Sequence, residues 1–78
     1  MWYVYILRCN NNKYYTGCTG NLEMRLERHN RGQVHYTSDK LPVELVNYVA
    51  FKEKYKAFQF EKYLKSGSGI AFRNKRLI

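Results

Sequence analysis

Three stretches of the chain have apolar and polar patterns typical of strands and are rich in the β-branched and aromatic residues that favour strands. The first two, Tyr3–Cys9 and Lys13–Cys18, are separated by Asn10–Asn12, and asparagine tolerates the backbone angles of tight turns. They predict a β-hairpin. The third stretch, Val43–Phe51, predicts another strand, with its odd-numbered residues on one face and its even-numbered residues on the other.

Two segments follow the spacing of three and four residues that gives a helix one apolar face. The first begins after Asn21, a favourable helix cap, and runs for about ten residues to a stop near Gly32. The second begins at Glu53 or Lys54, and the linker Ser66–Gly69 is expected to end it. Each predicted helix therefore follows a predicted strand.

The last segment, Ile70–Ile78, is a basic tail that we expect to form a short final helix, with Phe72 and Leu77 as apolar anchors. The element order is then β-β-α-β-α plus a short basic helical tail. This order predicts an α+β fold in which helices flank a small three-stranded sheet, mixed or antiparallel. We expect residues 1–78 to form a single domain.

The composition narrows the class of protein. Eight Tyr, four Phe and one Trp in 78 residues are too many aromatics for a disordered chain. No apolar run approaches the roughly 20 residues of a membrane-spanning helix, and the apolar start, Met1–Leu7, lacks the basic region and cleavage site of a signal peptide. We therefore expect a cytoplasmic protein without membrane contact, with Cys9 and Cys18 as free thiols.

The charge indicates a polyanionic partner. Fourteen Lys and Arg against six Asp and Glu give a net charge of +8 at pH 7, spread along the chain. Such a balance attracts nucleic acid and releases its counterions. A solvated basic surface or a structural RNA contact would carry the same charge, so the charge indicates a class of partner and not an activity.

Polar residues interrupt the apolar stripe of the first predicted helix. Leu22, Arg25, Leu26 and His29 follow the spacing that defines one helix face, so the two polar side chains point the same way as the leucines that must pack. Arg25 can lie over Leu22 with its charge in water, and His29 can be an ordinary half-buried histidine. The spacing alone leaves a structural and a functional interpretation open.

Glu61 lies on the apolar stripe of the second predicted helix, with Ala57, Phe60 and Leu64. A carboxylate at the rim of a core is costly unless it is paired or bound to a metal. A salt bridge with Arg25 between the two helices is one way to satisfy Glu61, and metal binding is the other.

Tyr5 and Tyr15 lie on the two strands of the predicted hairpin. They project from the same face if the turn has an odd number of residues. Tyrosines in such positions serve as strand-forming residues with polar tips, or as platforms on which bases stack.

The motifs, taken in order, resemble those of the GIY-YIG nuclease domain in its compact stand-alone form, similar to the catalytic domain of excision-repair nucleases. Tyr3-Val4-Tyr5 stands at the first name-giving triplet and Tyr15-Thr16-Gly17 at the second. The family has an arginine on the next helix and, in some branches, a histidine one turn later; Arg25 and His29 match these. Its metal-binding glutamate lies on a later helix, where Glu61 stands.

The resemblance extends from Tyr3 to about Lys65 and includes three departures. Tyr3 replaces the glycine of the first triplet, and Thr16 replaces the isoleucine of the second. Cys18 stands where some branches have a lysine. None of these departures falls on the polar positions that the family uses.

The resemblance implies a Mg²⁺-dependent or Mn²⁺-dependent endonuclease that hydrolyses phosphodiester bonds in DNA, on branched, nicked or damaged substrates in repair or recombination. One ion would bind Glu61, Arg25 would contact the scissile phosphate, and one of the two tyrosines would orient or deprotonate the attacking water. The implied catalytic residues are Tyr5, Tyr15, Arg25, His29 and Glu61. Only six acidic residues occur in the chain, which argues against a two-metal site.

Basic residues of the second helix and the tail are expected to bind flanking phosphates. Together with the helix arginine, the predicted nucleic-acid-binding residues are Arg25, Lys62, Lys65, Arg73, Lys75 and Arg76. Two other interpretations stay open: a catalytically inactive nucleic-acid-binding module of the same fold, and a structural RNA-binding protein. Nothing in the sequence identifies a protein partner or a homodimer.

Overall fold

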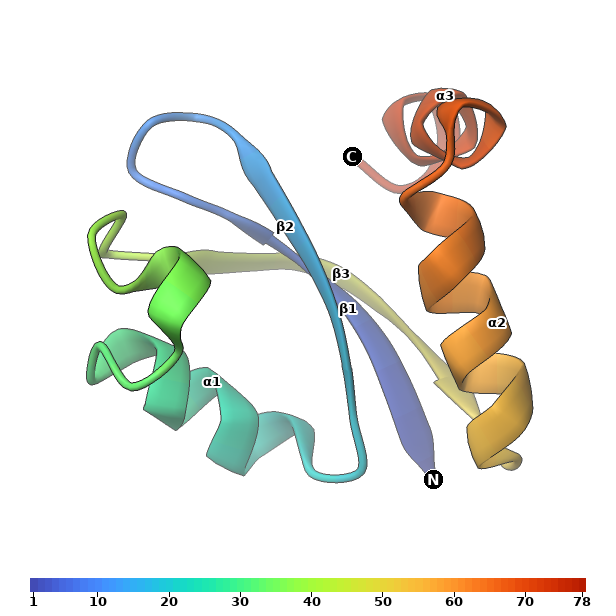
Figure 1. Cartoon of the computed structure of the whole chain (residues 1–78), viewed down its shortest axis with the longest axis horizontal. Helices are drawn as coiled ribbons and strands as arrows, with labels where there is room; N and C mark the ends of the chain where they lie inside the picture. Colours follow the sequence, from blue (N-terminus) through green and yellow to red (C-terminus); the bar gives the residue numbers. More distant parts are fainter.

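A computed structural model describes all 78 residues of the chain. The strands are β1 (Trp2–Arg8), β2 (Tyr14–Thr19) and β3 (Glu44–Phe51). The helices are α1 (Leu22–Asn30), α2 (Lys54–Leu64) and α3 (Gly67–Arg76), and a 3₁₀ turn covers His35–Thr37. The predicted α+β class and element order are confirmed. Figure 1 shows α1 and the 3₁₀ turn on one side of the sheet, with α2 and α3 on the other.

The sheet is antiparallel throughout, with the strand order β2-β1-β3. This order leaves β1 in the centre and β2 at an edge. In the hairpin, Tyr5 lies opposite Gly17, and Leu7 lies opposite Tyr15. Because alternate residues of a strand share a face, Tyr5 and Tyr15 project from the same face, which is the side that packs against α1.

The sequence pattern predicted that side chains alternate between the two faces along the whole of β3, and this prediction is wrong. Its pairing with β1 shifts between Asn47 and Leu45, so Val46 has no partner on β1. Val46 and Phe51 pack against the same apolar cluster, although strict alternation placed them on opposite faces. The reason is the irregularity itself, because one extra residue in a strand reverses the facing of the residues beyond it.

Each face of the sheet has its own small apolar core. On the α2 side, Val4 and Ile6 of β1 pack with Ala57 and Leu64 of α2. The core on the α1 side consists of Tyr5, Leu7, Cys9 and Val43. The middle of β1 is therefore closed to solvent on both faces, and a polar group there needs a partner within the protein.

The sequence predicted that the linker Ser66–Gly69 ends α2. In the structure this linker also begins α3. Ser66 is the N-cap of α3, and its side chain accepts a hydrogen bond from the Gly69 N–H at 3.2 Å. A Cβ at position 69 would collide with the main chain of Tyr63 and Leu64. Glycine therefore lets α3 start against the end of α2, at Gly67 and not within the predicted tail.

Cys9 is buried, Cys18 is half-buried, and both are free thiols as predicted. None of the helices has the length and apolar character needed to cross a membrane.

Candidate functional site

Four of the predicted site residues come together on the α1 face of the sheet. Tyr5 lies in the middle of β1, Tyr15 lies near the start of β2, and Arg25 and His29 are one turn apart on α1. Helix α1 begins directly after β2 because the Asn21 side chain caps it, accepting a hydrogen bond from the main-chain N–H three residues on. Residues four apart share a helix face, so Arg25 and His29 both reach Tyr5.

Tyr5 is fully buried, and its hydroxyl has two polar partners. The oxygen lies 2.9 Å from His29 Nε2, and Arg25 Nε donates a hydrogen bond to it at 3.3 Å. The ring of Tyr5 lies across Gly17 of β2, where a Cβ would collide with the ring and the hydroxyl. Gly17 is therefore required by the close approach of the Tyr5 side chain.

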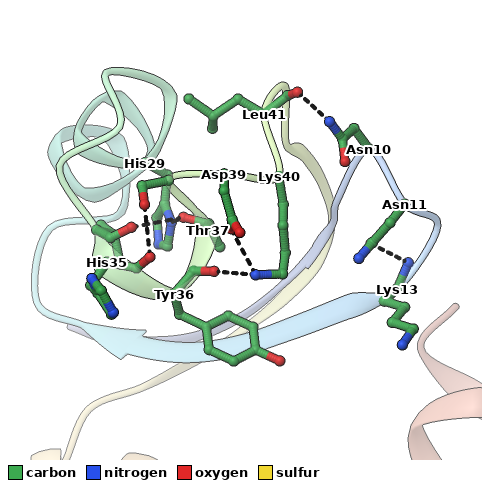
Figure 2. Close-up of polar contacts among 12 residues, drawn as sticks. Asn10, Asn11, Lys13, His29, His35, Tyr36, Thr37, Asp39, Lys40 and Leu41 are labelled. Carbon is green, nitrogen blue, oxygen red and sulfur yellow. Dashed lines mark hydrogen bonds and ion pairs between the residues drawn. The ribbon is translucent and has the colours of Figure 1, made fainter.

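His29 is also fully buried, and Thr37 fixes its orientation. Nδ1 of His29 lies 2.7 Å from Thr37 Oγ1, and the Thr37 hydroxyl donates to the Val34 carbonyl at 3.4 Å. Because the Thr37 hydroxyl donates its proton to Val34, it can only accept a hydrogen bond from His29. The ring proton of His29 is therefore assigned to Nδ1, and Nε2 accepts the hydrogen bond from the Tyr5 hydroxyl. Figure 2 shows His29 and Thr37 facing each other across this contact. Thr37 is not among the residues predicted from the sequence.

The buried pair is uncharged near neutral pH. Burial, together with the positive charges of Arg25 and Arg28, lowers the pKa of His29 from 6.5 to about 4. Burial also raises the pKa of Tyr5 from 10.0 to about 12, although the hydrogen bond from Arg25 opposes this change. The site therefore holds the charged Arg25 guanidinium against a neutral, directionally hydrogen-bonded Tyr5–His29 pair.

We expect the free energy of unfolding to fall as the pH falls from about 6.5 to about 4. In that window the unfolded chain protonates His29 and the folded chain does not, so protons favour unfolding, by about 3 kcal/mol over the whole window. Urea unfolding at pH 7 and pH 4.5 measures the effect. The loss should be smaller in His29→Gln and unchanged in His35→Gln, which removes an exposed histidine. An equal loss in all three proteins would contradict this assignment.

Tyr15 differs from Tyr5 because it is half-buried and lines an open cleft. Its ring centroid lies 5.2 Å from that of His29 and 5.3 Å from that of Tyr36, which belongs to the 3₁₀ turn. The cleft has a volume of about 360 Å³ and runs past the edge strand β2. We call it the β2 cleft; its lining includes Tyr15, Tyr36, Lys65 and Arg73. Tyr36 is not among the site residues predicted from the sequence.

Glu61 approaches this site from the other side of the sheet. It lies on α2, its side chain is 24% exposed, and Lys65 Nζ pairs with its carboxylate at 3.1 Å. The salt bridge with Arg25 that the sequence left open does not form, because Arg25 instead donates to Tyr5. The negative charge of Glu61 nevertheless helps to raise the pKa values of Tyr5 and Cys18. Its electrostatic effect therefore extends to β1 and β2.

The donor set around Glu61 limits the kind of metal ion it can hold. No cluster of three or more His, Cys, Asp or Glu side chains is arranged to bind a metal. One carboxylate suits Mg²⁺, which commonly keeps several waters and takes further ligands from substrate phosphates. The residues therefore fit an ion that is completed by a phosphate, and not one enclosed by protein ligands.

The predicted phosphate-binding residues of α2 and the tail lie in three places. Lys65 and Arg73 line the β2 cleft, and the Arg73 guanidinium lies 5.1 Å from the ring centroid of Tyr14. Lys62 instead borders a different depression on the outer side of α2, together with Tyr55. The remaining two, Lys75 and Arg76, are exposed at the end of α3 and do not line the cleft.

The chain matches a known protein family and is similar in sequence to several of its relatives. The GIY-YIG catalytic domain family matches residues 1–74 of the chain. A UPF0213 protein of Clostridium perfringens is 46% identical over 66 residues, which cover 83% of this chain and 71% of the relative. A UPF0213 protein of Pediococcus pentosaceus is 40% identical over 79 residues, which cover 95% of this chain and 82% of the relative.

A solved structure is similar over almost the whole chain. The solution NMR structure of a UPF0213 protein from Bacillus halodurans has a TM-score of 0.61 and 32% sequence identity. The similarity covers 99% of this chain and 87% of that one. The names of these relatives state neither a substrate nor an activity.

Proposed function

We propose that this chain, which belongs to the GIY-YIG catalytic domain family, is a metal-dependent endonuclease that hydrolyses phosphodiester bonds in DNA. Domains of this family are generally nucleases that act on nucleic acid. The observation that carries the proposal is the arrangement around β2: Arg25 is anchored on a buried Tyr5–His29 pair, and Tyr15 lines an open cleft. In this proposal residues 1–78 act as a single nuclease domain.

Arg25 would bind the scissile phosphate. Its Nε is held by the Tyr5 oxygen, and its Nη groups would donate to phosphate oxygens. The guanidinium stays charged at every working pH and matches the geometry of two phosphate oxygens. The chain of hydrogen bonds through Tyr5, His29 and Thr37 fixes its direction. Positive charge fixed in place is what a developing phosphorane requires.

Tyr15 would be the tyrosine that orients or deprotonates the attacking water. It is half-buried at the cleft, whereas Tyr5 is closed off and uses both its donor and its acceptor within the protein. A catalytic base should have a pKa near the working pH. A pKa of about 12 instead keeps the Tyr5 hydroxyl protonated near neutral pH, which makes Tyr5 a poor base. We therefore assign Tyr15 to the water, and Tyr5 and His29 to the positioning of Arg25.

Glu61 would hold one Mg²⁺ or Mn²⁺ ion, which when bound supplies Lewis-acid stabilisation of the charge that develops on the phosphate. To do so, Glu61 would release Lys65, its present partner. The freed ammonium group could then contact a phosphate of the same strand. Further cations for flanking phosphates are Lys62, Arg73, Lys75 and Arg76. The proposed substrate is branched, nicked or damaged DNA that arises during repair or recombination.

A catalytically inactive module that binds nucleic acid is the second candidate. One observation favours it: Glu61 is a lone carboxylate that is already paired with Lys65. The basic surface would be kept in such a protein, and only turnover would be lost.

A cleavage assay tests the proposal. Purified protein is incubated with supercoiled plasmid, linear duplex, flap, splayed-arm and four-way-junction DNA, each with Mg²⁺, Mn²⁺ or EDTA. We expect cutting of at least one substrate with a divalent ion and none in EDTA. Equal binding of every DNA without cutting under any condition would overturn the proposal and favour the inactive module.

A further inference from the structure

The β2 cleft combines aromatic, apolar and cationic side chains from four elements. Tyr15 comes from β2, Tyr36 from the 3₁₀ turn, Leu64 from α2, and Ile70 and Arg73 from α3. Lys65, just after α2, adds a second cation. A volume of about 360 Å³ is within the range of pockets that hold one small ligand. These features suit a flat, partly apolar ligand that also carries negative charge.

Tyr36 is the exposed aromatic side chain of this cleft, with 58% of its surface accessible. Its position is nevertheless fixed. The Tyr15 ring contacts it at a tilt of 34°, and Lys40 Nζ lies 4.7 Å from its ring centroid. Lys40 Nζ also donates to the Tyr36 carbonyl and pairs with Asp39, both at 2.8 Å. Figure 2 shows the Tyr36 ring projecting away from the turn toward the strand below it.

An exposed aromatic ring that is already held in place is suited to stacking. Ordering a mobile side chain costs free energy when a ligand binds, and a ring fixed in advance avoids most of that cost. Nucleobases stack on such rings with little dependence on sequence, because every base has a flat π-face. Lys65 and Arg73 in the same cleft supply the positive charge that the phosphate of the same nucleotide needs.

We infer that the β2 cleft binds one unpaired nucleotide beside the scissile phosphate, with its base against Tyr36 and its phosphate near Lys65 and Arg73. A base within a duplex is stacked on both faces and paired at its edge, so it cannot enter a cleft of this size without leaving the helix. The site therefore favours DNA with single-stranded segments. This inference rests on the proposed function in taking DNA as the ligand and in placing the scissile phosphate beside the cleft.

Binding in EDTA tests the inference without any cleavage. Fluorescence anisotropy compares a labelled single-stranded oligonucleotide and a 5′-flap with a blunt duplex of equal length. Tyr36→Ala should weaken binding to the single strand and the flap by about 5-fold to 100-fold, which is the usual contribution of one base–aromatic stack. Duplex binding should change less than twofold. Tyr36→Phe keeps the ring and should bind all three DNAs as the unmodified protein does.

Two control variants separate stacking from folding and from general surface effects. Tyr36→Leu keeps an apolar contact with Tyr15 but removes the π-face, so it should resemble Tyr36→Ala in binding while melting at the same temperature as the unmodified protein. Tyr55→Ala removes a tyrosine that is 72% exposed on α2 and lies outside the cleft, and it should change nothing. An equal loss on duplex and single strand, or no loss on either, would overturn the inference.

The outcome is distinguishable from that of the proposed function. A protein that prefers unpaired DNA in EDTA through Tyr36 but cuts none with Mg²⁺ or Mn²⁺ keeps the cleft assignment and loses the nuclease. A protein that cuts DNA with no contribution from Tyr36 to binding keeps the nuclease and loses the cleft assignment.

Discussion

Replacing Glu61 with glutamine is expected to reduce metal-dependent cleavage about a thousandfold or more. The amide keeps the shape of the side chain but removes the single carboxylate that faces the site from α2. Stabilisation of developing phosphate charge by a divalent ion amounts to several kcal/mol, and each 1.36 kcal/mol changes a rate about tenfold. Single-turnover cleavage of the best substrate, with Mg²⁺ at saturation, measures the loss.

The fold should survive this change, because the ion pair that is lost is a partly exposed contact between Glu61 and Lys65 on one helix turn. Such pairs contribute about 0.5 kcal/mol or less. Removing a carboxylate from the rim of an apolar core can even stabilise the protein, so Glu61→Ala should keep or raise the melting temperature. DNA affinity in EDTA should be unchanged or higher.

Glu27→Gln is the matched control, since Glu27 forms the corresponding i,i+4 pair with Arg31 on the solvent side of α1. It should cleave at the rate of the unmodified protein. Full activity of Glu61→Gln would remove the carboxylate from the mechanism. A melting temperature that collapses in this variant alone would instead assign Glu61 a structural role.

Replacing Arg25 with lysine is expected to lower the cleavage rate by about 100-fold to 1,000-fold, even though the charge is kept. Removing one positioned hydrogen-bond donor from a developing negative charge has effects of this size. Lysine cannot hold the Tyr5 oxygen through one nitrogen while two others face the phosphate, as the Arg25 guanidinium can. Steady-state and single-turnover rates on the same substrate measure the loss.

Arg28→Lys is the matched control, because Arg28 is an exposed arginine on the same helix. Its rate should match that of the unmodified protein. Arg25→Ala adds an independent reading: the pKa of His29 should rise when the neighbouring positive charge is removed, and NMR titration of the imidazole follows it. Full activity of Arg25→Lys would show that charge alone suffices and that anchoring by Tyr5 is not used.

Much of the fold could be predicted from local patterns. Residue types that favour strands identified β1 and β2, and alternation identified β3. Asn21 marked the start of α1, and Gly32, whose φ in the structure is 73°, marked its end. These signals act within a few residues and do not depend on the rest of the chain. The irregularity at Val46 and the early start of α3 were missed, because both depend on how one element packs against another.

The candidate site was predicted as a set of residues but not as an arrangement. Periodicity placed Arg25 and His29 on one helix face, and the structure brings both to Tyr5. The two residues that complete the arrangement, Tyr36 and Thr37, lie in a segment without any apolar period. No pattern in the sequence distinguishes them from ordinary loop residues.

The sequence by itself determined the element order, the basic charge and the identity of the polar residues on apolar helix faces, because each of these follows from composition or from short-range spacing. Only the tertiary structure decided that Tyr5 is closed off while Tyr15 reaches the cleft, and that His29 is neutral. Those properties arise from burial and from hydrogen bonds between distant positions, such as the contact of Tyr5 with His29, 24 residues apart. Burial sets the protonation of a group, and burial exists only once the elements have packed.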